Sequence, residues 1–245
     1  MDSWPCITAI VNTYNRPEKL NRALHSVLDQ DFDDYEIVVI HDGPMSGETK
    51  EIVQKAEKIS TVPFYPVATA ENSGYQCVPK NAATWLAKGD YISYLDDDNT
   101  WSNDHLSVLH AAIEEGESWP DFTYGRREYV CEDGCSGPYE GISPLVPFTE
   151  DNVKAMSNSP AYNFIDTSDA LVSKGAIWRL HLATGRMWNE DIRRFGDWEF
   201  FTRGIFFSGW KGKAVDHVVQ KYYWHGNNLQ LTRPVSEPRY KERSV

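Results

Sequence analysis

Three consecutive aspartates, Asp96, Asp97 and Asp98, follow directly on an apolar run of strand-forming residues at 91–95. Carboxylates this close repel one another, and at the end of a buried strand the repulsion is costly unless a cation, a proton or several donors offset it. Oxygen ligands without softer ligands nearby favour Mg²⁺ or Mn²⁺ over zinc or copper. An acidic loop or a helix start explains the triplet alone equally well, because Asp is a common N-cap.

Two more apolar runs end in polar residues earlier in the chain. Residues 7–11 lead into Asn-Thr-Tyr-Asn-Arg-Pro at 12–17, and the β-branched run at 36–40 ends at His-Asp-Gly, which contains Asp42. Apolar residues at helical spacing follow at 20–28, 52–59 and 79–87, and a strand expected at 62–67 contains two prolines, which favours a sheet edge. This alternation predicts an α/β fold with a mostly parallel central sheet flanked by helices.

The carboxyl ends of parallel strands meet at one edge of a sheet, where ligands of open α/β sheets bind. We therefore expect Tyr14, Arg16, Asp42 and the aspartate triplet to share that edge. Neither a GxGxxG stretch after the first strand nor a GxxxxGK[ST] loop is present in the sequence. If phosphate binds at this edge, a metal and basic side chains must hold it.

The 245 residues are 41% hydrophobic and carry a net charge of -12. This composition is that of an ordinary globular chain, and its charge argues against a broad surface for nucleic acid, although a local basic groove is compatible with it. We find no signal peptide and no membrane span, so a cytoplasmic, reduced location is expected. Cys131 and Cys135 form an isolated CxxxC, weak evidence for zinc, and are expected to be two unremarkable thiols.

The ordered motifs of the chain resemble those of the family 2 glycosyltransferases with the GT-A fold. The opening loop at 12–17, the aspartate of the second strand, an N-x-G element at 72–74 and Lys80-Asn81 come first. Residues 95–99 resemble the family's DxD motif, and residues 195–201 and 223–228 resemble its E-D-x-E-L and Y-x-H-x-x-N segments. Each motif is weak alone, and their shared order makes the resemblance strong.

The resemblance implies an inverting enzyme that moves one sugar from a nucleoside diphosphate sugar, by family habit a UDP-sugar, to an acceptor hydroxyl. Asp98 and His225 would hold Mn²⁺ or Mg²⁺, and Asp197 would be the general base. Carboxylates at 197 and 199 also suit the first turn of a helix, and both interpretations can hold together. The donor would contact Thr13, Tyr14, Arg16, Asp42, Asn72, Lys80, Asp96 and Asp97.

Two positions depart from the family pattern. Gly196 stands where a glutamate is common, and Lys80 stands where arginine is common, which keeps the charge but loses the bidentate fork. The Q-x-x-R-W element of processive synthases does not occur downstream, which favours transfer of a single sugar.

We expect residues 1–121 to form the donor half and residues 122–232 the acceptor-binding and catalytic half of one domain, followed by a basic tail at 233–245. A hairpin is expected after 126–130, then a long loop rich in Gly, Pro and Ser at 137–159, and a strand and helix over 169–177. Trp188, Trp198 and Glu199 are candidates for the acceptor side. The tail is expected to be solvated or to contact a second subunit, so a homo-oligomer is compatible with the sequence.

Two other classes stay open on the sequence alone. A nucleotidyltransferase or another Mg²⁺-dependent phosphotransfer enzyme also places carboxylates at a sheet edge, although it usually carries a glycine-rich phosphate loop. A silent module that binds a nucleotide sugar or a glycan would retain only the fold. The acceptor itself, whether saccharide, lipid carrier, protein or, against the charge, nucleic acid, is not defined by the sequence.

Overall fold

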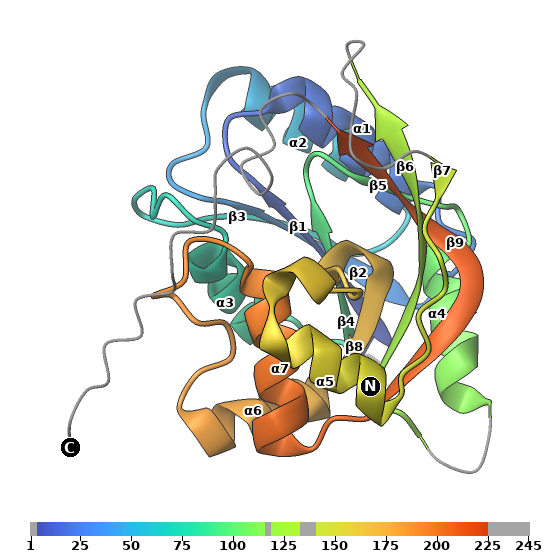
Figure 1. Cartoon of the computed structure of the whole chain (residues 1–245). Helices are drawn as coiled ribbons and strands as arrows, with labels where there is room; N and C mark the ends of the chain where they lie inside the picture. Colours follow the sequence, from blue (N-terminus) through green and yellow to red (C-terminus); the bar gives the residue numbers. More distant parts are fainter. Residues whose placement is uncertain (1–3, 116–118, 133–140, 225–245) are drawn as a thin grey trace.

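The computed structural model describes residues 4–115, 119–132 and 141–224. Its first half alternates strands and helices, which confirms the predicted pattern (Figure 1). In chain order these elements are β1 (Ile7–Thr13), α1 (Pro17–Leu28), β2 (Tyr35–His41), α2 (Gly47–Ile59), β3 (Phe64–Ala68), α3 (Cys77–Leu86) and β4 (Tyr91–Asp96).

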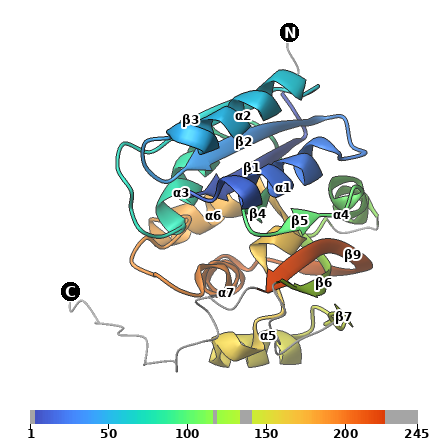
Figure 2. The same ribbon diagram turned by 90° about the horizontal axis from the view of Figure 1, so that it is seen from above.

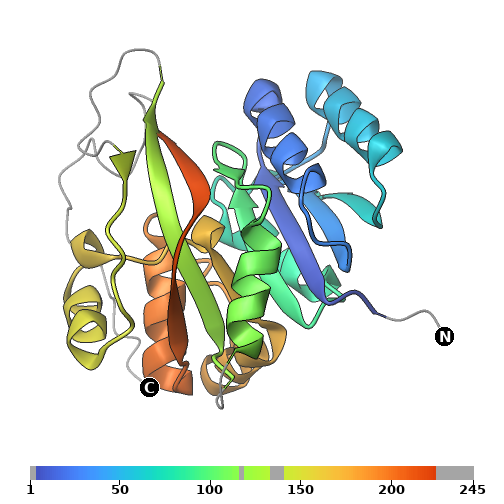
Figure 3. The ribbon, with the colours of Figure 1, turned by 90° about the vertical axis from the view of Figure 1, so that its right-hand side faces the viewer.

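The second half is less regular and contains the longest strands. It comprises β5 (Thr100–Trp101), α4 (His105–Glu114), β6 (Phe122–Cys131), β7 (Gly141–Ile142), α5 (Glu150–Asn158), the 3-10 turns η1 (Pro160–Tyr162) and η2 (Thr167–Asp169), β8 (Ala170–Ser173), α6 (Lys174–Thr184), α7 (Gly196–Ser208) and β9 (Gly212–Trp224). β6 and β9 run side by side along the molecule, with α5 in yellow on one side and α1 and α2 in blue on the other (Figure 3).

Within the described residues, one sheet has the order β3-β2-β1-β4-β8-β6-β9-β5, with β7 paired to β6. Strands β3, β2, β1 and β4 are parallel, so their carboxyl ends share one edge. β8 pairs antiparallel with both β4 and β6 and so joins the two halves of the sheet. β3 is an edge strand, as Pro66 within it and Pro63 just before it predicted.

Two apolar cores cover the two faces of this sheet. One core packs α1, α2 and α4 against the sheet, through residues such as Leu24, Val53 and Leu109. The other packs α3, α6 and α7, through residues such as Ile177 and Phe200. Figure 2 shows α5 on the outer side of α7, where its Met156 is fully buried. The helices thus cover both faces of the sheet and hold in place the edge where polar residues were predicted to gather.

The structure corrects two expectations for the second half. Part of the long loop expected at 137–159 is the helix α5, which Thr149 caps by accepting a hydrogen bond from the Asn152 N–H. Cys131 is disulfide-bonded, so an unremarkable thiol there was wrong, and Cys135 lies outside the described residues. The expected hairpin is present as the antiparallel pair β6 and β7. In the part of the chain that is described, no helix is both long and apolar enough to cross a membrane.

Candidate functional site

The ends of β1, β2 and β4 bring the predicted residues to one edge, as expected. Thr13 pairs with His41 in the sheet register, and Asn12 pairs with Asp96. The carboxyl ends of β1, β2 and β4 are therefore level in the sheet to within a residue or two. The loops that carry Tyr14, Arg16, Asp42 and the aspartate triplet therefore leave the sheet together. This edge is the candidate site.

Asp96, the first aspartate of the triplet, faces Lys80 of α3. The Lys80 Nζ lies 2.9 Å from a carboxylate oxygen of Asp96 and 3.3 Å from the Thr167 hydroxyl, and it stands over the Trp188 ring, 4.9 Å from its centroid. The lysine is fully buried. Burial disfavours its charged form, but the adjacent carboxylate outweighs burial and holds the pKa of Lys80 above its ordinary value.

Asp97 turns inward and ties the β1 loop to the end of β4. One of its oxygens accepts hydrogen bonds from the Thr13 hydroxyl at 2.7 Å and the Tyr14 N–H at 3.4 Å. The other accepts a hydrogen bond from Arg16 at 3.2 Å. Burial, reinforced by the neighbouring Asp98, raises the pKa of Asp97 to about 6, although Arg16 opposes the shift. The Asp97 carboxylate therefore holds the loop at 13–16 in its conformation.

The Asp98 side chain is 22% exposed, and Arg16 lies 3.0 Å from it. The guanidinium of Arg16 thus bridges Asp97 and Asp98. Asn15, next to this arginine, has a positive φ of 49°, a conformation that asparagine tolerates better than most residues. The tight turn at Asn15 directs Arg16 back over the carboxylates.

Asp42 is held by the loop that contains Asn72. Its carboxylate accepts hydrogen bonds from the Asn72 side-chain amide at 3.0 Å, the Ser73 N–H and hydroxyl at 2.9 Å each, and the Gly74 N–H at 3.1 Å. The structure therefore brings Asp42 and Asn72 together, as the prediction of a shared donor site requires. In this conformation Asp42 anchors the 72–74 loop, and a nucleobase would have to share its oxygens with these donors.

Asp197 lies in the first turn of α7, as predicted, and is buried. One carboxylate oxygen accepts a hydrogen bond from the Asn163 side-chain amide at 2.8 Å. Burial, and next the charge of Asp166, raise the pKa of Asp197 to about 7, while the Trp198 N–H and Lys80 oppose the shift. The start of α7 lies against α3, since a Cβ on Gly196 would be 3.0 Å from the Cys77 sulfur, and Lys80 of α3 pairs with Asp96 at the strand edge. A carboxylate that is half protonated near neutral pH suits a general base.

A buried ion pair beside Asp197 was not predicted from the sequence. Arg127 of β6 lies 2.5 Å from Asp169 and 3.7 Å from Asp166, and it donates a hydrogen bond to the Phe164 carbonyl. Asp169 is fully buried. These residues are distant in sequence and meet only because β8 lies between β4 and β6. The one local signal was the spacing of Asp166 and Asp169, which form a capping box around η2.

The predicted acceptor-side residues take different places. Glu199 accepts hydrogen bonds from Arg203 at 2.8 Å and from Asn189 at 3.1 Å, so its charge is already paired within α7 and the preceding segment. Trp188 is fully buried, stacked on Phe200 with ring centroids 4.1 Å apart. Trp188 thus supports Lys80 from beneath.

Trp198 is half-buried and donates its indole N–H to the Met156 carbonyl of α5. Of the two tryptophans predicted for the acceptor side, Trp198 is the partly exposed one, because Trp188 is fully buried. The contact of Trp198 with α5 connects the start of α7 to the outer helix of this half of the fold.

Gly196 lies close to α3. A Cβ on this glycine would lie 3.0 Å from the Cys77 sulfur, so a larger residue here requires the Cys77 side chain to shift by a few tenths of an ångström. Phe195, just before it, has a positive φ of 56°, which costs a bulky residue roughly 1–2 kcal/mol. Asn15 and Phe195 are the two non-glycine residues of the described chain with positive φ, and both flank the candidate site.

The side chains present fit a divalent cation by the kind of ligand they offer. Mg²⁺ and Mn²⁺ take hard oxygen ligands, and in phosphate sites one or two carboxylates suffice because phosphate and water complete the shell. Asp96 and Asp98 supply such oxygens, although each is paired with a cation of the protein. No cluster of three acidic, His or Cys side chains suited to a metal is found among the described residues. His225, the other predicted ligand, lies outside them.

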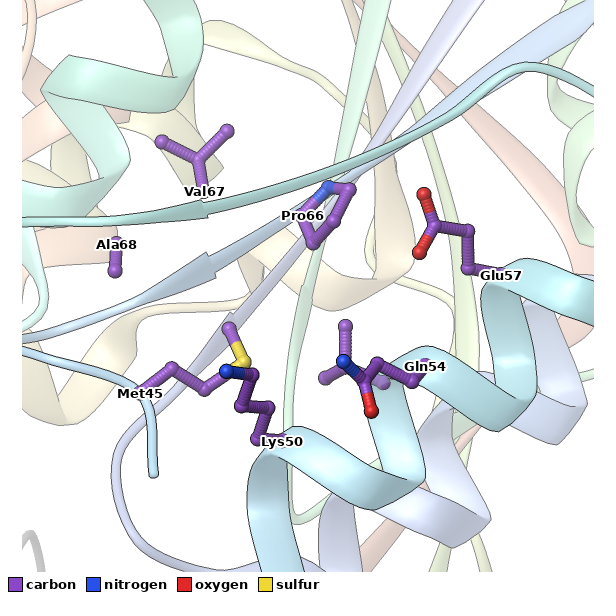
Figure 4. Close-up of a pocket in the computed structure, with 8 residues that line it drawn as sticks. Met45, Lys50, Gln54, Glu57, Pro66, Val67 and Ala68 are labelled. Atoms are coloured by element: carbon purple, nitrogen blue, oxygen red, sulfur yellow. The ribbon is translucent and has the colours of Figure 1, made fainter. Parts of the chain in front are cut away.

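Two hollows lie outside this edge. One, of about 210 Å³, is formed between α2 and β3 by residues that include Met45, Lys50 and Pro66, and none of the predicted site residues lines it (Figure 4). The other, of about 620 Å³, lies along α3 and includes Trp85, Asn81 and Trp188. The predicted donor residues line neither hollow, whereas Trp188, predicted for the acceptor side, lines the second.

The order of the strands and the helices on both faces of the sheet are those of a GT-A type glycosyltransferase fold. A family model described as glycosyl transferase family 2 matches residues 8–136, and the chain belongs to this family. The chain is 28% identical over 178 residues to TuaG of Bacillus subtilis (strain 168), a protein named as a glycosyltransferase of teichuronic acid biosynthesis. The matched region is 72% of this chain and 59% of TuaG.

Solved structures share the fold. Residues 1–349 of S. aureus TarS in complex with UDP-GlcNAc superpose with a TM-score of 0.66 at 19% identity, over 89% of this chain and 58% of that one. The mannosyltransferase PcManGT from Pyrobaculum calidifontis, in complex with GDP-Man and Mn²⁺, gives 0.64 at 20% identity, over 93% and 59%. The chain thus spans less than two thirds of each of these three proteins.

Proposed function

We propose that this chain transfers a single sugar from a nucleoside diphosphate sugar, in particular a UDP-sugar, to an acceptor hydroxyl with inversion at the anomeric carbon. One observation carries the proposal: Asp197, a buried carboxylate with a pKa of about 7, begins a helix that lies against α3, and Lys80 of α3 pairs with Asp96 at the strand edge. This arrangement supplies a proton acceptor beside a site for a charged leaving group.

The donor side rests on the three strand ends. Thr13, Tyr14 and Arg16 form the loop over Asp97, and Asp42 with Asn72 forms the neighbouring wall. A UDP-sugar is favoured because a protein of the same fold is described in complex with UDP-GlcNAc. Arg16 and Lys80 are two cations at this edge that can contact diphosphate oxygens. To do so, each must give up its present ion pair with a carboxylate.

Mn²⁺ or Mg²⁺ is proposed as the cofactor, held by Asp98 with Asp96 beside it and with His225 as the further ligand implied by the family resemblance. A neighbour of the same fold is described with Mn²⁺. When bound, such a cation stabilises the negative charge of the departing diphosphate as a Lewis acid. For Asp98 to serve as a ligand, Arg16 must move from it, and the exposed position of both side chains permits this.

The acceptor side rests on Asp197. Its carboxylate takes the proton of the acceptor hydroxyl while that oxygen attacks the anomeric carbon from the face opposite the nucleoside diphosphate. The bond from the anomeric carbon to the diphosphate oxygen breaks with its electron pair on the diphosphate, and the configuration inverts. Trp198, partly accessible beside Asp197, is the aromatic side chain best placed to contact an acceptor sugar.

A saccharide or a glycoconjugate is the proposed acceptor, since TuaG is named for the synthesis of a polysaccharide acid. The net charge of -12 disfavours a nucleic-acid acceptor.

The test is a panel of nucleotide sugars, each assayed for thermal stabilisation and for slow donor hydrolysis with Mn²⁺, with Mg²⁺ and with a chelator. We expect at least one UDP-sugar to stabilise the protein more strongly with metal than with chelator, and to release UDP. Stabilisation by nucleoside triphosphates with release of pyrophosphate would instead indicate a nucleotidyltransferase. Binding without turnover on any acceptor would indicate a silent module.

A further inference from the structure

The side chain of Asn163 is held in one orientation by its own segment. Asn163 follows η1, and its N–H donates to the Pro160 carbonyl at 3.1 Å. Its side-chain oxygen accepts a hydrogen bond from the Ile165 N–H at 3.4 Å. Because the oxygen is used in this way, the amide nitrogen is the group directed at Asp197, and it donates to the Asp197 Oδ2 at 2.8 Å.

The two oxygens of Asp197 differ as a result. Oδ2 carries the hydrogen bond from Asn163, whereas Oδ1 is buried and has no side-chain hydrogen-bond partner in the described part of the protein. The Trp198 N–H in the same turn acts on this carboxylate and lowers its pKa. A buried carboxylate oxygen with so few partners is costly and is usually a sign of function or of a missing partner.

Charged and titratable groups that interact electrostatically with Asp197 lie on several elements. Arg127 and Lys80 are cations that attract the Asp197 carboxylate, and Asp96 and Asp166 are anions that repel it. Because these forces oppose one another, charge alone does not fix the position of Asp197. The facing groups are Cys77 and Lys80 of α3, Asp96 of β4, Arg127 of β6, Asp166 before η2 and Tyr222 of β9. Asn163 is the neutral side chain that bonds directly to Asp197.

We propose that Asn163 is a positioning residue for the general base: its amide holds Asp197 Oδ2 and so fixes the orientation of the carboxylate that takes the acceptor proton. This inference rests on the proposed function, in which Asp197 takes that proton. The reason is geometric, because a carboxylate held at one oxygen loses rotation about its last bond and keeps the other oxygen in a single place.

The first readout needs no activity. A ¹³C-carboxyl NMR titration of Asp197 compares the wild-type protein with Asn163→Ala and Asn163→Asp. A hydrogen bond to the ionised form lowers a pKa, so its loss in Asn163→Ala should raise the pKa of Asp197 by roughly one unit. The added like charge in Asn163→Asp should raise it further. An unchanged titration in both variants overturns the proposal, whatever the enzyme's substrate.

The second readout is kinetic. With a donor from the panel, Asn163→Ala should lower kcat roughly tenfold or more, leave the donor KM within about twofold and move the pH midpoint upward, since only the base is affected. Asn163→Gln, which keeps the amide, should recover part of kcat and serves if the alanine variant fails to fold. Wild-type kcat and pH midpoint in both variants would contradict the assignment.

Asn189→Ala is the matched control. Asn189 makes the same kind of contact, from its amide to the Glu199 carboxylate at 3.1 Å in the same helix. Its variant should leave the titration of Asp197 unchanged. If Asp197→Asn turns over normally, the proposed base is wrong; if that variant is inactive while Asn163→Ala behaves as wild type, only the role of Asn163 is wrong.

Discussion

The ammonium of Lys80 lies 2.9 Å from the carboxylate of Asp96, and no part of the lysine side chain is exposed. The pair joins α3 to the end of β4 directly beneath the site. Lysine takes the place of the arginine that is common in the family, and its nitrogen lies 4.9 Å from the centroid of the Trp188 ring.

Lys80→Met should destabilise the protein because it leaves Asp96 without its cation. The loss should be about 3 kcal/mol, the low end of the usual range for breaking a buried pair, since the Asp96 side chain keeps 28% exposure. Urea unfolding gives the value, and Lys80→Met with Asp96→Asn should recover part of it. The control is Lys88→Met, at an exposed lysine that contacts Tyr65, which should unfold like wild type. Equal stability of Lys80→Met and Lys88→Met would show that the pair contributes nothing.

Asp98→Asn should remove the metal-dependent part of UDP binding. The carboxylate of Asp98 is the proposed ligand, and an amide is a much weaker ligand for Mn²⁺. Calorimetric titration of UDP with Mn²⁺ and with a chelator measures this part, and Asp151→Asn, at an exposed carboxylate of α5, is the control. A full metal effect in Asp98→Asn would exclude Asp98 as the ligand.

The rate of transfer should rise with pH and reach half its maximum near pH 7. Burial and the charge of Asp166 raise the pKa of Asp197 to about 7, and a general base works only when deprotonated, so activity is lost as pH falls through that value. Asp166→Asn removes the like charge and should move the midpoint of kcat/KM to lower pH. A midpoint near pH 4 in the wild type, or an upward shift in the variant, would contradict this assignment.

Glu199→Gln should lower stability more than it lowers acceptor binding. Arg203 is buried and donates to both oxygens of Glu199, at 2.8 and 3.2 Å, so neutralising Glu199 leaves a buried guanidinium partly unpaired. The expected loss is about 3 kcal/mol in urea unfolding. Glu51→Gln, at an exposed position on α2, should change nothing. Normal stability with a raised acceptor KM would instead support the acceptor-side role predicted from sequence.

The parallel half of the fold was predictable because each element carries its own pattern. The β-branched run at 36–40 became β2, and Pro63 and Pro66 correctly predicted that β3 lies at an edge. Asp197 was predicted at a helix start and lies in the first turn of α7. Local signals of this kind depend on neighbours within a few residues and so are present in the sequence.

The antiparallel half was harder because its contacts join distant segments. The ion pair of Arg127 with Asp169 exists only because β8 separates β4 from β6. The contact of Asn163 with Asp197 likewise depends on how the segment after α5 crosses α7. For α5 a local signal did exist, since Thr149 precedes two acidic residues, but the surrounding glycines and prolines obscured it.

The central claim is that Asp197 takes the proton of the acceptor hydroxyl in a donor-bound enzyme. The most direct measurement is transfer by Asp197→Asn at saturating donor, together with its affinity for that donor. The account predicts a donor Kd within about twofold of wild type and a transfer rate lower by roughly 10²-fold or more, because general-base catalysis typically contributes 10²–10⁴. Normal transfer by Asp197→Asn would contradict the account.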